Sequence, residues 1–168
     1  MKESEMCIRD SNGDYSYGWL LLNDTIAVRS ETPLECSGIL RLAKLQTIDS
    51  VETEYEQRLF EDSYGNLYED DYRFRASNGA YAVFLLGGDY TEFSGTFSAG
   101  EGTNSQNNIK VEVYADEQLV FEQDGIGRTT KAVPFTLDVT GIHNLKIVTS
   151  DSSEEYEGYL YLAGDGLQ

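Results

Sequence analysis

The chain has 168 residues, a length that suits one domain of ordinary size. Its 30 Asp and Glu residues outnumber 12 Lys and Arg residues, so the formal net charge is −18. This balance argues against a nucleic-acid partner, because phosphate binding depends on Lys and Arg, and anionic membrane surfaces are disfavoured for the same reason. No stretch approaches the ~20 apolar residues of a membrane span, so we predict no membrane insertion.

The beginning of the chain differs from the remainder. We assign residues 1–32 to a polar N-terminal segment that is partly disordered or foreign, and residues 33–168 to the folded domain. Disorder is expected over residues 1–16. Two short runs, Tyr17 to Leu22 and Thr25 to Val28, predict a hairpin around a turn-prone Asn-Asp pair.

The sequence shows no export signal at its start. We therefore expect either a cytoplasmic protein or a piece of a longer exported chain, and we favour the second, with an extracellular or cell-surface location. The two cysteines, Cys7 and Cys36, do not make a disulfide framework, and whether they pair is left open.

The central stretch, residues 51–71, is rich in acidic side chains, and a helix is expected near residues 51–60. The run Asp62-Ser63-Tyr64-Gly65-Asn66 lies within this stretch and favours a hairpin. We expect a type I′-like turn at Gly65-Asn66 or at a neighbouring pair.

The last hundred residues alternate between apolar and polar side chains, which is the pattern of strands with one buried face. The alternation is clearest over residues 109–113, 135–139 and 145–148. Turn signals separate these strands, at Gly87-Gly88-Asp89, Asp116-Glu117, Asp124-Gly125, Thr140-Gly141 and Gly164-Asp165. Short strands between such turns, without a long amphipathic helix, predict an all-β antiparallel sandwich.

The order of several segments resembles the NPCBM-like family of carbohydrate-binding-type modules. The resemblance covers roughly residues 37–167 and rests on Asp62 to Tyr68, Tyr90 to Gly95, Val111 to Asp116 with Leu119 to Phe121, and Leu137 to Val148. It implies a jelly-roll-like, galactose-binding-like sandwich of extracellular bacterial proteins, often attached to glycoside hydrolases or surface proteins. Sugar-binding members carry a Trp near the C-terminus, whereas here the matching position falls at or near Leu162.

No motif for catalysis is present. The nearest approach to a Gly-x-Ser-x-Gly elbow, residues 96–100, lacks its first Gly. The single histidine, His143, has no paired nucleophile and is interpreted as a surface or capping residue. The Gly-rich stretches lack the phosphate-binding pattern, and no carboxylate pair stands out as a glycosidase site. We therefore predict that the chain is not an enzyme.

Metal sites are weakly indicated. Two Cys and one His are too few for a transition-metal site, and we predict no cofactor. A structural Ca²⁺ is left open, because Ca²⁺ takes carboxylate and carbonyl oxygens and the loops carry Asp62, Asp70-Asp71 and Asp151 with Glu154-Glu155.

Sugar binding requires flat aromatic faces together with groups that hydrogen-bond hydroxyls. Five residues are candidates because they lie in predicted loops or on the polar face of the last strand: Tyr64, Asn66, Tyr156, Tyr159 and Tyr161. In that strand Leu160 and Leu162 share one face, which we expect in the core, so the two flanking tyrosines are expected to point outward or pack on a neighbouring strand.

The sequence thus predicts a monomeric, non-catalytic module that binds a glycan or glycoconjugate weakly and forms part of a larger chain. The alternative is a structural or protein-binding sandwich that has lost the sugar site. An acidic hydrolase is a third class, supported only by the abundance of carboxylates.

Overall fold

The structure is a computed structural model that describes residues 3–9, 15–21, 40–62, 64–76, 79–100, 103–104, 107–153 and 158–168. The chain divides into two compact units, residues 1–38 and 39–168. The predicted boundary, after residue 32, lies six residues before this division. Among the described residues, no helix has the length and hydrophobicity of a membrane span.

The described residues of the N-terminal unit form an antiparallel strand pair. Strand β1 (Glu3–Arg9) pairs with β2 (Tyr15–Leu21), with Glu3 opposite Leu21 and Arg9 opposite Tyr15. Strand β1 falls within residues 1–16, where we expect a disordered or foreign segment, and β2 uses a partner that precedes it in the chain. Residues 25–28, its predicted partner, lie outside the described residues, as does Cys36.

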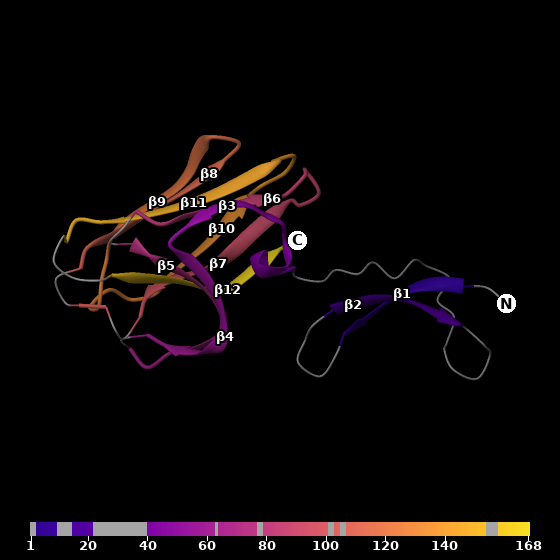
Figure 1. Ribbon diagram of the computed structural model, residues 1–168, viewed down its shortest axis with the longest axis horizontal. Coiled ribbons are helices and arrows are strands. Elements are labelled where there is room, and N and C mark those ends of the chain that lie inside the picture. The colour runs from indigo at the N-terminus through magenta and orange to yellow at the C-terminus, as the bar shows by residue number, and fades with distance from the viewer. Residues whose placement is uncertain are drawn as a thin grey trace. The chain divides into compact units, whose positions relative to one another are not determined.

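The second unit is a β-sandwich of two five-stranded sheets, which confirms the predicted fold (Figure 1). A short 3₁₀ turn, η1 (Leu42–Lys44), precedes the strands of this unit. One sheet has the order β10-β7-β12-β5-β4, and we call it the β12 sheet; the other has the order β3-β6-β11-β8-β9. The strands are β3 (Thr47–Val51), β4 (Thr53–Glu61), β5 (Leu67–Arg75), β6 (Tyr81–Leu85), β7 (Glu92–Ala99), β8 (Ile109–Ala115), β9 (Gln118–Ile126), β10 (Val133–Asp138), β11 (Asn144–Asp151) and β12 (Tyr159–Leu167).

The core lies between the two sheets and follows the alternation of the sequence. In β8 every second residue from Ile109 to Ala115 is buried, as its pattern predicts. Phenylalanines from both sheets, among them Phe74, Phe84, Phe93 and Phe97, are fully enclosed. Burial of these apolar side chains is the main force that holds the sheets together.

Three local predictions are wrong. The expected helix near residues 51–60 is wrong, because residues 53–61 form strand β4. The expected turns at Asp124-Gly125 and Gly164-Asp165 lie within β9 and β12, close to shifts in strand register. Gly125 and Gly164 have positive φ there, which is the backbone form that a β-bulge often requires.

The bulge in β12 has a structural consequence. It turns the Asp165 side chain inward, where its Oδ2 accepts a hydrogen bond of 2.6 Å from the backbone N–H of Leu42. Two backbone hydrogen bonds between Leu40 and Leu167 continue this contact. The sandwich therefore binds its first described residues to its last strand.

Candidate functional site

Strand β12 presents Leu160 and Leu162 to the core, where both are fully buried, as predicted. Tyr159 and Tyr161 point to the opposite, outer face of the β12 sheet because side chains alternate along a strand. The two tyrosines nevertheless have different surroundings: Tyr159 is half-buried, whereas Tyr161 is only 6% exposed.

Tyr161 is covered by the β4–β5 hairpin, which curls over the outer face. The ring of Phe60 stacks on that of Tyr161, with 4.0 Å between centroids and 10° between planes. Gly100 lies so close that a Cβ there would overlap the Tyr161 ring. Tyr161 therefore packs against a neighbouring element, which is the second of the two arrangements expected for this face, and its part in sugar binding stays a prediction.

The tip of the hairpin is organised by Asp62, which is 3% exposed. Its carboxylate accepts hydrogen bonds from the backbone N–H groups of Tyr64 and Asn66, from the Asn66 side-chain amide and from the Tyr68 hydroxyl. Burial alone would raise the pKa of Asp62, but the hydrogen bonds from Asn66, Tyr64 and Tyr68 outweigh it and hold the pKa below its ordinary value. Asp62 also forms a β-bridge with Gly100, which fastens the tip to the end of β7.

Tyr64 and Asn66 lie at this tip. The Tyr64 hydroxyl donates a hydrogen bond of 2.5 Å to the carbonyl oxygen of Thr129, yet half of the residue is exposed. Asn66 is exposed, but its amide is engaged by Asp62. Gly65 has positive φ and Asn66 does not, so the turn at this pair is not of type I′.

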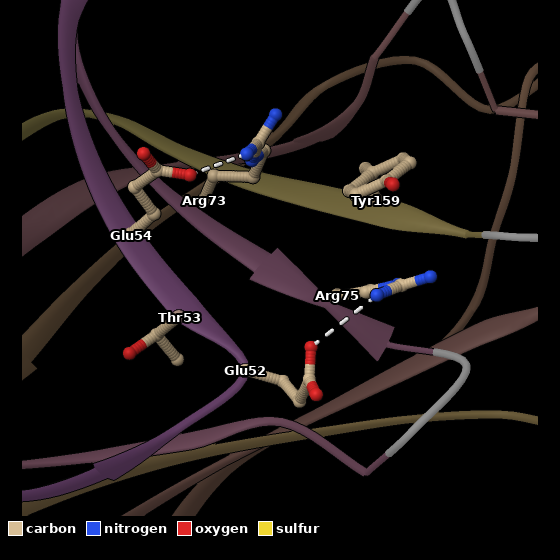
Figure 2. Close-up of a pocket in the computed structure, with 6 residues that line it drawn as sticks. All are labelled: Glu52, Thr53, Glu54, Arg73, Arg75 and Tyr159. Atoms are coloured by element: carbon tan, nitrogen blue, oxygen red, sulfur yellow. Dashed lines mark hydrogen bonds and ion pairs between the residues drawn. The ribbon is translucent and has the colours of Figure 1, made fainter.

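Tyr159 borders an open pocket on the outer face of the β12 sheet, with a volume of about 240 Å³. Its lining comes from β4 and the residue before it, from β5 and from β12, which are neighbours in the sheet. Figure 2 shows the side chains that line it. The lining residues are Glu52, Thr53, Glu54, Arg73, Arg75 and Tyr159. Carboxylates, guanidinium groups and an aromatic ring therefore stand in three neighbouring rows.

Contacts across these rows hold the side chains in place (Figure 2). Arg73 and Glu54 form an ion pair of 2.5 Å, and Arg75 and Glu52 form one of 3.6 Å. The guanidinium carbon of Arg73 lies 5.2 Å from the centroid of the Tyr159 ring, within range of a cation–π contact.

Backbone geometry adds a special feature at Glu52, which joins β3 of one sheet to β4 of the other. Its φ of 52° lies in the left-handed region, which a residue with a side chain rarely adopts. Its carbonyl oxygen accepts a hydrogen bond of 2.9 Å from the backbone N–H of Arg75, so the corner is fixed beside the pocket.

The structure brings one of the five predicted sugar-binding residues, Tyr159, to this pocket. Tyr156 lies outside the described residues. The sequence analysis missed the charged lining residues, although Arg73-Phe74-Arg75 alternates and predicts two basic side chains on one strand face. Their pairing with Glu52 and Glu54 depends on strand register, which the sequence alone does not reveal.

Other candidate groups have structural partners. The backbone N–H of His143 is hydrogen-bonded by Asp116, and its ring Nδ1 lies 3.2 Å from the carbonyl oxygen of Gly141. Asp151 accepts hydrogen bonds from Asn107, Asn108 and Ser153. Across the described part of the chain, no three His, Cys, Asp or Glu side chains are grouped to hold a metal ion.

The second unit is thus an antiparallel β-sandwich with an open, polar pocket on the outer face of one sheet. The NPCBM/NEW2 domain family matches residues 75–160, just over half of the chain. The chain belongs to this family. No curated protein matches it.

Solved structures share its fold. CBM51 from Clostridium perfringens GH95, in complex with methyl-galactose, has a TM-score of 0.66 at 17% identity, over 77% of this chain and 99% of that one. The tandem CBM51 modules of the Streptococcus pneumoniae family 98 glycoside hydrolase give 0.69 at 14% identity, over 93% of this chain and 55% of theirs. The CBM51-2 and INT domains of C. perfringens ZmpB, in complex with GlcNAc, give 0.64 at 14% identity, over 96% and 36%.

Proposed function

We propose that the chain is a non-catalytic module that binds glycans weakly, with Tyr159 and the surrounding charged side chains as its binding site. The observation that carries this proposal is the convergence of an aromatic ring, two guanidinium groups and two carboxylates on one open pocket. Membership of the family supports it, as does a fold shared with modules whose structures contain methyl-galactose or GlcNAc.

The chemistry of the pocket suits a sugar. A tyrosine ring packs against the C–H face of a pyranose, while carboxylates accept and guanidinium groups donate hydrogen bonds to its hydroxyls. A guanidinium carries five N–H donors, so one arginine can hold a carboxylate and also donate to a ligand. One ring contact with a few hydrogen bonds, less the cost of association, gives about 3–6 kcal/mol, or a Kd from millimolar to tens of micromolar.

The absence of catalysis is part of the proposal. A glycosidase acid is a carboxyl group that burial keeps protonated at neutral pH. The Glu52 and Glu54 side chains are instead 40% and 61% exposed, and each is paired with an arginine. These carboxylates suit ligand contact better than proton transfer.

We further propose that the module is carried by a larger exported protein and acts as a monomer there. The supporting observation is that related modules occur beside other domains. The M60 catalytic domain of C. perfringens ZmpB was solved together with CBM51-1 and CBM51-2, and this chain spans 17% of that structure.

Protein binding is the second candidate function, and one feature favours it. Large apolar side chains are exposed at the β3 edge of the second sheet, where Ile48 is 50%, Val51 42% and Leu85 41% exposed. A protein partner for this edge would use a surface on the other sheet from Tyr159. The two functions are therefore separable by mutation.

The decisive experiment is an NMR titration of the full chain with methyl-galactoside and with N-acetylglucosamine, each to tens of millimolar. We expect shifts at the pocket, lost in Tyr159→Ala and kept in Tyr114→Ala. Tyr114 is a matched control because it is half-buried on the outer face of the other sheet. Tyr156→Ala, in the same titration, tests the predicted loop residue. No shift with either sugar or with a wider glycan panel would favour the protein-binding alternative.

A further inference from the structure

The two arginines of the pocket both face carboxylates of their own chain. Glu54 and Arg73 are directly opposite each other in the β4–β5 register, and Glu52 reaches Arg75 from the residue that precedes β4. Among the described side chains that line the pocket, two positive and two negative charges therefore balance. Without the glutamates, the guanidinium groups would make the pocket a receptor for carboxylate or sulfate.

Stability alone does not explain why these carboxylates are present. The side chains of both pairs are substantially exposed, from 26% for Arg73 to 61% for Glu54, and exposed ion pairs contribute little to the free energy of folding. Glu52 also occupies a left-handed backbone position that favours glycine or asparagine. Glu52 therefore places its carboxylate beside Arg75 from a backbone conformation that costs free energy.

The net charge of the whole molecule also disfavours anionic ligands. A net charge of −18 repels anionic ligands at long range, and the local pairs remove the attraction that the arginines would provide at short range. The carboxylate of a uronic acid would either share a guanidinium with Glu52 or Glu54, where like charges repel, or displace that glutamate and leave it without its cation. An uncharged sugar only adds hydrogen bonds to groups already in place.

We propose that Glu52 and Glu54 are specificity-determining residues, which restrict the pocket to uncharged sugars by occupying Arg73 and Arg75. The proposal rests on the proposed function, since it concerns the same pocket. It names the class of glycan that the site accepts, a neutral hexose or N-acetylhexosamine, and the class that it rejects, sugars with a carboxylate or sulfate.

The test compares galactose with galacturonic acid, and glucose with glucuronic acid, by NMR titration of the full chain at constant ionic strength. The variant is the double substitution E52Q/E54Q, which retains the side-chain shape and removes both negative charges. The control is E112Q/E122Q, which changes the net charge equally on the outer face of the other sheet, where both glutamates pair with Lys110 at 2.9 and 3.2 Å. Thermal unfolding of each variant checks that the fold is retained.

We expect the wild-type chain and the control to bind the neutral sugars at least fivefold more tightly than the matching acids. The double variant should gain at least fivefold in affinity for the acids. An equal gain in the control would reduce the effect to net charge and overturn the proposal, as would a wild-type chain that prefers the acids. A third outcome is that no protein binds a neutral sugar and only the double variant binds the acids. This outcome would support the role of Glu52 and Glu54 in excluding anions, but it would reject the proposal that the wild-type chain binds glycans. No binding by any variant would overturn both.

Discussion

Tyr159 and Tyr161 are two residues apart on the same strand and the same face, yet they belong to different parts of the molecule. Where β4 begins and β5 ends, the hairpin leaves Tyr159 beside an open pocket of charged side chains. Near its tip, the hairpin places Phe60 on Tyr161 and removes the Tyr161 ring from solvent. Strand alternation therefore identifies the face that a side chain occupies, whereas the element that covers this face decides between binding and packing.

The largest expected effect concerns the covered tyrosine. Tyr161→Ala should lower the free energy of unfolding by about 3–5 kcal/mol, because it removes a buried ring from its stack with Phe60. Chemical denaturation measures this loss, with Leu160→Ala as a core comparison at about 2–5 kcal/mol. A loss below about 1 kcal/mol would mean that the hairpin does not seal this face.

The tip that holds the hairpin closed comes next. Asp62→Ala should cost about 2–3 kcal/mol at neutral pH, because it leaves several donors without their acceptor. The pKa of Asp62 is lower in the folded chain than its ordinary value of 3.8, so its contribution is present above that pH and is lost as the pH falls through the folded pKa. Denaturation of wild type and Asp62→Ala from pH 7 to 2 should therefore converge at the acid end. Parallel curves would contradict the role assigned to this carboxylate.

Gly100 tests how closely the hairpin approaches the sheet. A methyl group at this position would overlap the Tyr161 ring, so Gly100→Ala should cost about 1–3 kcal/mol. Thermal denaturation checks the prediction, and Gly141→Ala serves to separate steric overlap from backbone strain. Gly141 has open space around it but a positive φ, so any loss of stability in Gly141→Ala reflects backbone strain alone. If Gly100→Ala is as stable as wild type, the tip of the hairpin does not pack tightly against the end of β7.

The smallest effect on stability is expected at the pocket, where the hairpin leaves the sheet open. Glu52→Gly should raise the free energy of unfolding by about 0.5–1 kcal/mol, because glycine adopts the left-handed backbone at position 52 without strain and the exposed ion pair contributes little. Denaturant titration measures the change. A clear loss of stability would instead assign the Glu52–Arg75 pair a structural role.

Much of the fold was predictable from the sequence because alternation over Ile109–Ala115 and the two core leucines of β12 records a sheet with one buried face. The charged pocket was not predictable, since it depends on the register that sets Glu54 opposite Arg73. The burial of Tyr161 depends on a hairpin curling over a distant strand. Both are tertiary effects that local patterns do not contain.

We expect the outer face of β12 to bind sugar through Tyr159, whereas Tyr161 packs beneath the β4–β5 hairpin. The most direct test is to measure sugar affinity and unfolding free energy on Tyr159→Ala, using whichever of methyl-galactoside and N-acetylglucosamine the wild-type chain binds more tightly. We predict a loss of binding of at least tenfold with a change in stability below about 1 kcal/mol. Unchanged binding, or a loss of stability as large as that of Tyr161→Ala, would contradict this division of roles between the two tyrosines.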